Sequence, residues 1–478
     1  MATPVRTKES GAHAPGRPDG SSAVPARRAG GRAPGIAAAA AGPFARLTQA
    51  TRTAPGRLRL AGALLAVLTL AFGALTAAQL NSRAQAANRV VSYSQPLSQA
   101  AADIHLSLAD ADTTAATGFL LAGAEPRAVR ARYEEDLRRA SQLISEAAAR
   151  TTTSSPAQEW LSALNQQVPV YAGLVESARA ENRQGFPLGG AYLRYASEQM
   201  RTVLLPAAAK LTAAENDALA ADLADARATP WAGYLLGLVA LTALVWVQLA
   251  LFRRTNRVFN IGMLTATAAV LSAALWLTVA ATGADSTLRR AEREGAAPLR
   301  VLNAARVDVL TARLAENLHL VARGSSTKYA ELWSKTTGHL FDGGTPGRGP
   351  VGTLVEAQRL APPDAGGPVD QALRGYQQWR ERHDVAVKLE NVDGDYQGAL
   401  DTTVTVKEAD VPKTADASFN AVDQQLQRAA VLEEGGFRDA ALGVDKDLRT
   451  AAVAVALLGL LAAASAVRGL GRRLAEYR

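Results

Sequence analysis

The sequence predicts an all-α integral membrane protein, with four transmembrane helices and two extracytoplasmic four-helix bundles in a duplicated arrangement. Three observations lead to this prediction. Four apolar runs lie along the 478 residues, and a short basic turn joins the middle two. Long stretches with helical apolar spacing separate this central pair from the first and last runs. Basic charge gathers at both chain ends and in the central turn, as the positive-inside rule predicts for segments facing the cytoplasm.

The central hairpin is the strongest signal. Residues 231–252 and 258–283 contain no charged side chain, and each run is long enough to cross a hydrocarbon core at 1.5 Å per helical residue. The turn between them, residues 253–257, holds Arg253, Arg254 and Arg257. We therefore expect a hairpin that enters from outside, turns in the cytoplasm and leaves again.

Two further spans complete the predicted topology. Residues 58–80 form the first span, and residues 450–467 form the fourth, which is short unless its flanking arginines snorkel. Ala84-Gln85-Ala86 has the form of a signal-peptide cleavage site, but the apolar run is long for a signal peptide, so an uncleaved anchor is favoured. We expect residues 1–57 to be a disordered basic cytoplasmic tail and residues 468–478 a second basic tail, with both termini at the cytoplasmic face of the plasma membrane.

The segments between the spans, residues 81–229 and 284–448, have the pattern of extracytoplasmic helical domains. In the first, apolar residues from Leu161 to Ala178 recur at steps of three and four, which is the seam of a left-handed bundle. Glycine- and proline-containing breaks divide each segment into helices. The prolines at 96, 169 and 206 are expected to kink their helices. In the second segment, we expect a loop over residues 361–368 and a helix from 369 to 390.

Charge and composition exclude several classes of protein. The chain has no cysteine, which rules out disulfides and cysteine chemistry. Residues 1–59 carry a net charge of +8, while the hairpin turn and the residues after 467 carry +3 each. The whole chain is only +8, so −6 is left for the two large segments. A nucleic-acid-binding protein seldom divides its charge around apolar spans in this way.

No catalytic motif is present, and we expect no enzymatic activity, no cofactor and no metal. Two clusters of polar residues are candidate sites. Asp103, His105, Asp110 and Asp112 lie on one predicted helix, but positions two apart face different ways, so a solvated acidic helix is the favoured interpretation over a metal site. A second predicted helix carries polar residues that would either contact a small charged ligand or form the solvent-exposed face of an amphipathic helix, and the solvent-exposed face is favoured. These residues are Arg306, Asp308, Arg313, Glu316, Asn317 and His319.

The predicted spans contain almost no ionisable group, which argues against a transporter or channel. They do contain small residues at the spacing of helix-packing contacts. Gly233 and Gly237 form a G-x-x-x-G pair, and Gly459 with Ala463 forms a looser one. These residues are the predicted helix-packing positions.

The layout resembles two kinds of sensory protein. A span, a tall four-helix bundle and a second span resemble the sensor module of bacterial chemoreceptors, in which helix shifts carry the signal. The paired outer domains, together with the C-terminal sequence from Arg472 to Arg478, resemble a family of four-pass actinobacterial membrane proteins (GlnX-like). This resemblance implies a relay in which an outer solute-binding lipoprotein binds acidic amino acids, and a soluble serine/threonine kinase responds inside.

The sequence therefore favours a non-enzymatic transmembrane sensor or signal relay. Its partners are expected to be membrane lipid, an outer solute-binding lipoprotein and a cytoplasmic serine/threonine kinase, while a homodimer remains an open alternative and no nucleic acid is expected. The rival interpretations are a structural or scaffolding envelope protein and an accessory subunit of a transporter. The expected contacts with an inner partner are Arg253, Arg254, Arg257, Arg472 and Arg473. The expected distal outer loops contain Gly123, Glu125, Gly185, Phe186, Gly324, Asp393 and Asp395.

Overall fold

The computed structural model describes residues 54–121, 125–152, 155–255, 260–323, 325–344, 349–405, 407 and 409–475. Within these ranges the side chains of residues 54, 55, 254, 255, 435–441 and 473–475 are left out of the description. The chain divides into two units, Met1–Arg57 and Leu58–Arg478. The predicted tail at residues 1–57 lies almost wholly outside the described residues.

Helices make up nearly all of the described chain, which has no strand and a single antiparallel bridge between Asp342 and Val351. The first half contains α2 (Ala54–Arg89), α3 (Gln95–Leu120), α4 (Arg127–Arg150), α5 (Ala157–Arg183), α6 (Leu188–Gln199), α7 (Leu205–Arg227) and α8 (Trp231–Thr255). The second half contains α9 (Ile261–Ala291), α10 (Ala297–Val321), α11 (Thr327–Leu340), α12 (Thr353–Leu360), α13 (Pro363–Asn391), α14 (Tyr396–Thr403) and α15 (Ala415–Ala475).

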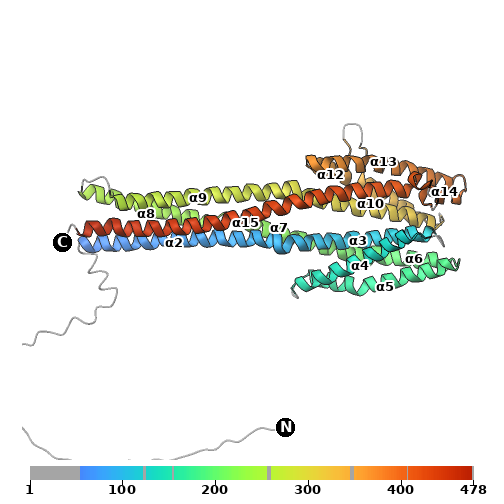
Figure 1. Cartoon of the computed structure of the whole chain (residues 1–478), viewed down its shortest axis with the longest axis horizontal. Coiled ribbons are helices and arrows are strands. Elements are labelled where there is room, and N and C mark those ends of the chain that lie inside the picture. Colours follow the sequence, from blue (N-terminus) through green and yellow to red (C-terminus); the bar gives the residue numbers. More distant parts are fainter. Residues whose placement is uncertain are drawn as a thin grey trace, which may run out of the picture. The chain divides into compact units, whose positions relative to one another are not determined.

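Four helical stretches of the described chain are long and apolar enough to cross a membrane, which makes this a multi-pass membrane protein. They lie within Gly56–Leu120, Leu188–Arg253, Ile261–Val321 and Leu442–Arg472. Figure 1 shows α2, α8, α9 and the C-terminal part of α15 side by side at one end of the molecule, with the remaining helices at the other. We call these remaining helices the helical body: α3–α7, α10–α14 and residues 415–434 of α15.

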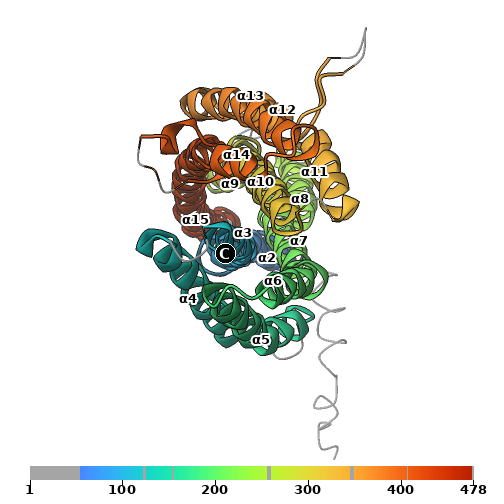
Figure 2. The same cartoon turned by 90° about the vertical axis from the view of Figure 1, so that its right-hand side faces the viewer.

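The helical body is built around α3 and α10. Figure 2 shows these two helices near the centre, with α4, α5 and α6 on one side and α12 and α13 on the other. The two halves share buried residues: Leu314 and Leu318 of α10 belong to the apolar core formed by α3–α7. Leu106 and Ala109 of α3 belong to the core of the second half. The helices therefore pack as one continuous body, whereas the sequence predicts two four-helix bundles, one in each half of the chain.

Three prolines are accommodated by π-helices. Pro96, Pro206 and Pro298 each follow a five-residue π-helix, at Val90–Ser94 (η1), Met200–Leu204 (η3) and Glu292–Ala296 (η4). In each case the residue before the proline donates its N–H to the carbonyl five residues back. Proline has no N–H, and its ring would clash with the carbonyl four residues back, so a wider turn relieves both problems. Pro169, by contrast, lies inside a continuous α5.

Glycines bring the apolar helices close together. The Gly233 N–H donates to the Gln79 Oε1 of α2 at 3.0 Å, and the Phe72 ring of α2 occupies the space beside Gly237. Gly459 of α15 faces Gly73 of α2 so closely that a Cβ added to it would lie 2.8 Å from the Gly73 Cα. Small residues allow this approach, which maximises dispersion contacts between helices in lipid.

The tightest contact joins α9 to α15. A Cβ on Gly262 would lie 2.5 Å from the Gly469 Cα and 2.6 Å from the Ser465 carbonyl oxygen. Asn260 supports this contact, because its Nδ2 donates to the Gly469 carbonyl at 2.8 Å and its Oδ1 caps α9 by accepting from the Gly262 N–H. The N-terminal end of α9 is therefore fastened to the last turns of α15.

Replacing Gly262 by leucine should force α9 and α15 apart and destabilise the four-helix membrane section by about 1–3 kcal/mol. The thermal midpoint of the full-length protein in detergent checks this. Gly283→Leu is the matched control, because Gly283 lies on the same helix with no atom within 4 Å of an added Cβ. Equal midpoints for the two variants would contradict the packing described here.

The start of α13 differs from the expectation. The predicted loop over residues 361–368 is mostly helix, since α13 begins at Pro363 and contains Pro368. Pro363 occupies the first helical position, where its missing N–H has no cost. Pro368 lies only one and a half turns later, so just one backbone hydrogen bond is lost.

Candidate functional site

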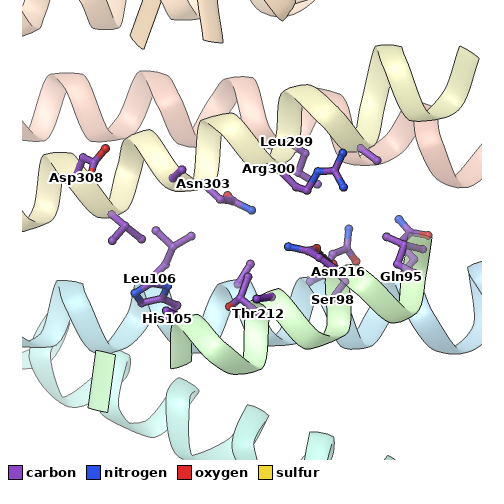
Figure 3. A pocket seen from close by; sticks show the side chains of 18 of the residues that line it. Gln95, Ser98, His105, Leu106, Thr212, Asn216, Leu299, Arg300, Asn303 and Asp308 are labelled. Atoms are coloured by element: carbon purple, nitrogen blue, oxygen red, sulfur yellow. Dashed lines mark hydrogen bonds between the residues drawn. The ribbon is translucent and has the colours of Figure 1, made fainter. Parts of the chain in front are cut away.

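Two cavities lie on either side of the contact between α3 and α10. The first, which we call the apolar pocket, has a volume of about 390 Å³ and is lined mainly by α3, α7 and α10, together with Ala296 of η4 and His339 of α11. Figure 3 shows α3 and α7 along one wall and α10 along the other. The labelled side chains come from α3 (Gln95, Ser98, His105, Leu106), α7 (Thr212, Asn216) and α10 (Leu299, Arg300, Asn303, Asp308).

His105 is the most unusual group in the apolar pocket. Burial lowers the pKa of its imidazole to about 4, so the ring is neutral at pH 7. Neither ring nitrogen has a hydrogen-bond partner among the described residues. Two other pairs of polar groups there are already in contact: the Ser98 hydroxyl donates to Asn216 at 2.7 Å, and His339 Nδ1 lies 2.8 Å from Asp308. His105 is thus a free donor and acceptor on a mostly apolar wall.

The second cavity, the charged pocket, has a volume of about 410 Å³ and is lined by α3, α4, α10 and α15. Arg132 of α4 makes two-pronged contacts of 2.9 and 3.1 Å with Asp110 of α3, and it donates to Asn420 of α15 at 3.0 Å. Arg306 of α10 donates to Asp423 of α15 at 3.0 Å. The charged pocket therefore ties helices of the first half to helices of the second.

The two pockets share four lining residues, which sit in the contact between α3 and α10. They are Gln99, Leu106, Leu299 and Asn303. The Gln99 amide nitrogen is buried and makes no hydrogen bond to any residue that the structure describes. A molecule bound in either pocket would consequently touch residues of the same contact between α3 and α10.

The polar residues of α10 lie in the interior, so the interpretation of this face as solvent-exposed is wrong. Arg313 is 0% exposed, and its guanidinium contacts Glu316 at 2.5 Å and Asp416 at 2.9 Å. Trp379 Nε1 donates to Glu316 at 3.0 Å, and His383 Nδ1 lies 2.9 Å from the same carboxylate. Because α10 is packed by α3, α11, α12 and α15, it has little solvent-facing side. The paired charges form a buried network.

The interpretation of α3 as a solvated acidic helix is also wrong, for the same reason. Asp112 is 0% exposed and accepts hydrogen bonds from Tyr171 of α5 at 3.0 Å and Ser197 of α6 at 2.9 Å. Its other oxygen has no hydrogen-bond partner in the described part of the chain. Burial raises the pKa of Asp112 to about 7. Asp110, two residues away, faces Arg132 instead, so these carboxylates do not converge on one point.

Four of the five predicted inner contacts belong to the C-terminal ends of α8 and α15. Arg253 is exposed in the last turn of α8, and Arg472 is exposed near the end of α15. Arg254 and Arg473 belong to these helices, but their side chains lie outside the described residues, as does Arg257 entirely.

The predicted distal residues that the structure describes lie at the other end of the helical body, the end at which Figure 1 shows α6 and α14. Phe186 is 53% exposed, next to Gly185 with its φ of +77°. Asp395 caps α14 by accepting from the Gly398 N–H, and the Asp393 N–H donates to Lys388 at the end of α13. Glu125 is paired with the buried Arg179 at 3.1 Å. Gly123 and Gly324 lie outside the described residues.

Sequence reasoning missed the basic and acidic residues of α4 that line the charged pocket. Arg132, Asp136 and Arg139 step by four and three along the chain. They run one position before the apolar series that starts at Tyr133, so they border its buried stripe. That spacing could have identified these residues, because charged side chains at the border of a buried helix face lie next to the neighbouring helices.

A further set of contacts ties the helices together near the membrane. Arg89 at the end of α2 pairs with Asp222 of α7 at 3.2 Å, and Ser94 of η1 donates to the same carboxylate. Arg227 at the end of α7 pairs with Glu292 of η4 at 2.5 Å. The two π-helices that precede α3 and α10 are thus both joined to α7.

Comparison with known proteins finds a family model that matches part of this chain. Residues 86–224 match the family model of the actinobacterial sensor domain. The match extends from the last turn of α2 to the last turn of α7, so it covers Asp112 and the first-half wall of both pockets. It supports a sensory role of actinobacterial type for this chain. Comparisons with curated proteins and with solved structures give no match.

Proposed function

We propose that this protein is a non-enzymatic transmembrane sensor that relays an extracytoplasmic signal to a separate partner in the cytoplasm. The helical body would lie outside the plasma membrane, and both termini inside, as the basic segments favour. The proposal joins the sensor-domain match to the geometry of the two pockets.

One observation carries the proposal: the helices that line the pockets continue towards the membrane. α3 follows α2 through η1, and α10 follows α9 through η4, with no break in helical backbone. α15 runs for 61 residues from the charged pocket to Ala475. A change in the contact between α3 and α10 would therefore move helices whose other ends lie across the membrane, either as a shift along the axis or as a rotation.

The resemblance to GlnX-like relay proteins suggests what lies at each end. The outer signal would be an acidic amino acid or a solute-binding lipoprotein loaded with it. Phe186, Leu188 and Val392 are at least half exposed around the distal turns, where such a lipoprotein would dock. The inner partner would be a soluble serine/threonine kinase that contacts the exposed basic ends of α8 and α15.

The thermal stability of the full-length protein in nanodiscs tests the outer half of this proposal. Because the two halves share their cores, the whole chain is the correct sample. Midpoints are recorded with an amino-acid panel, with candidate solute-binding lipoproteins, and with both. A ligand at 100 times its Kd should stabilise by about 2.7 kcal/mol. Stabilisation only by the loaded lipoprotein supports the relay, and stabilisation by the free amino acid supports a direct receptor. No stabilisation in any arm would favour a structural envelope protein.

The inner half makes its own prediction. Changing all five inner arginines (Arg253, Arg254, Arg257, Arg472 and Arg473) to lysine keeps the charge that sets topology but removes the guanidinium fork. If these groups contact the partner, binding of the kinase to the nanodisc-held protein should weaken at least tenfold in a pull-down titration. Arg289→Lys, on α9 towards the helical body, is the matched control. Unchanged binding would leave the five residues as topology signals alone.

A further inference from the structure

The charged pocket has an excess of negative charge that the protein does not neutralise. Its described lining contains three arginines and five carboxylates, which leaves −2 when all are ionised. Each arginine already has a carboxylate: Arg132 with Asp110, Arg306 with Asp423, and Arg139 with Asp103. The remaining acids are Asp136 on α4 and the exposed Glu434 on α15.

Asp136 is the carboxyl group that lacks a counter-ion. One of its oxygens is buried without a hydrogen bond, and no ion pair to it is formed among the described residues. Burial, and then repulsion from Asp110, raise the pKa of Asp136 to about 8. A half-buried carboxylate without a hydrogen-bond partner is costly, so the group holds a proton at pH 7. A cation in the pocket would supply the missing partner.

The other lining groups favour an organic cation over a metal ion. No group of three or more acidic or histidine side chains in the described part of the chain could hold a metal. The pocket instead offers side-chain amides from three helices, at Gln99 on α3, Asn303 on α10, and Gln424 and Gln427 on α15. The Gln99 Nε2 is buried and unpaired, so it has a donor to offer to a ligand acceptor. Carboxylates surrounded by amides match an ammonium or guanidinium group on a polar molecule.

We propose that the charged pocket binds a small organic cation carrying a primary ammonium or guanidinium group, with the Asp136 carboxylate as its counter-ion. The cavity of about 410 Å³ is large enough for a molecule of this kind. A bound cation would touch α3 and α4 of the first half and α10 and α15 of the second. Any effect of the bound cation on signalling rests on the sensing role proposed above, whereas the binding of the cation does not depend on that role.

Proton release is the expected signature of this site. Binding of a cation at pH 7 should ionise Asp136 and release close to one proton. The charged groups that surround Asp136 set this behaviour. They are Asp103 and Asp110 on α3, Arg132, Glu135 and Arg139 on α4, Arg306 on α10, and Asp423 and Glu434 on α15.

Isothermal titration calorimetry of the full-length protein in nanodiscs tests the proposal. The probes are 1,4-diaminobutane and L-arginine, titrated at pH 7 in two buffers of different ionisation enthalpy. L-glutamate, CaCl₂ and NaCl at matched ionic strength are titrated in parallel. We expect a saturable heat with one or both organic cations, with a buffer dependence that reports proton release, and tighter binding at pH 8.5. Heat only with glutamate or only with CaCl₂ would overturn the proposal, as would no saturation with either organic cation.

Variants place the binding at Asp136. Asp136→Asn should weaken the binding at least tenfold and abolish proton release, whereas Asp384→Asn, an exposed aspartate on α13, should change neither. Unchanged affinity in Asp136→Asn would overturn the assignment. The thermal midpoint of the empty protein checks that this variant folds. The midpoint of the variant should fall less steeply than that of the wild type as the pH rises towards 8, because position 136 then has no carboxyl to ionise. None of these readouts involves signalling, so a failure here leaves the proposed relay to its own test.

Discussion

Replacing Arg313 by methionine is expected to destabilise the helical body by about 3–5 kcal/mol, because it leaves the Glu316 carboxylate buried without its cation. Desolvation alone would raise the pKa of Glu316. Attraction to Arg313 and the hydrogen bond from His383 outweigh it, and the pKa stays below its ordinary value. Methionine fills a similar volume, so the loss comes from the charge rather than from a cavity. Tryptophan fluorescence during denaturant unfolding measures the effect, since Trp379 contacts Glu316 directly.

The control for this experiment is Arg380→Met, an exposed position on α13 that belongs to no ion pair among the described residues. It should shift the unfolding midpoint little. A second variant, Arg313→Met with Glu316→Leu, removes both charges and should recover much of the lost stability. If the single variant loses less than about 1 kcal/mol, the network is not the buried ion pair that the distances indicate.

The second large effect concerns Asp112 and pH. The pKa of this carboxyl is raised by burial to about 7 in the folded protein, against about 3.9 in an unfolded chain. Below pH 4 both states hold the proton, and the contribution to stability is fully present. As the pH rises from 4 to 7, the unfolded chain releases its proton while the folded protein keeps it. Stability therefore falls, and the group accounts for a loss of about 4 kcal/mol by pH 8.

Asp112→Asn should remove this pH dependence. Asparagine can still accept the hydrogen bonds from Tyr171 and Ser197 through its one carbonyl oxygen. Unfolding free energies measured at pH 5 and pH 8 should differ less for the variant than for the wild type. Asp217→Asn, an exposed position on α7, serves as the control and should keep the wild-type difference. A variant as pH-dependent as the wild type would show that Asp112 ionises freely in the folded protein.

The helices could be predicted well because local signals fix them. The breaks at Gly123–Pro126, Thr151–Ser155 and Gly185–Pro187 were visible as glycine, proline and hydroxyl residues, and α4, α5 and α6 begin or end beside them. Apolar periodicity correctly selected buried residues such as Leu161, Leu164 and Tyr171. Apolar runs without charge likewise marked the four membrane helices.

The pairing of α3 with α10 could not be predicted, and the site depends on it. These helices lie about 200 residues apart in the chain, yet Asn317 of α10 donates to Thr117 of α3 at 2.9 Å. Each carries polar residues on several faces, which in a single helix is the usual sign of solvent exposure. Here those residues meet partners on other helices. Apolar periodicity shows which face of a helix is apolar. It contains no information on which distant helix packs against the polar face.

The π-helices were also beyond sequence reasoning, although their prolines were visible. Proline chemistry predicts a kink at Pro96 and Pro206, and Pro298 has the same chemistry. All three are alike in the structure, and two of them mark the points where α2 becomes α3 and α9 becomes α10. A proline shows that a hydrogen bond is missing, but the surrounding packing decides whether the helix bends or widens.

The central claim is that a change in the helical body reaches the far ends of the membrane helices. Because the chain has no cysteine, spin labels can be attached at Arg59→Cys on α2 and Gly471→Cys on α15, and the distance between them measured by electron paramagnetic resonance in nanodiscs. The perturbation is Arg132→Gln, which releases α4 from Asp110 and Asn420. A second label pair, at Glu135→Cys and Glu381→Cys, reports the helical body itself. The relay predicts a shifted distance distribution for both pairs. A shift in the helical body with an unchanged distribution between Arg59→Cys and Gly471→Cys would contradict it.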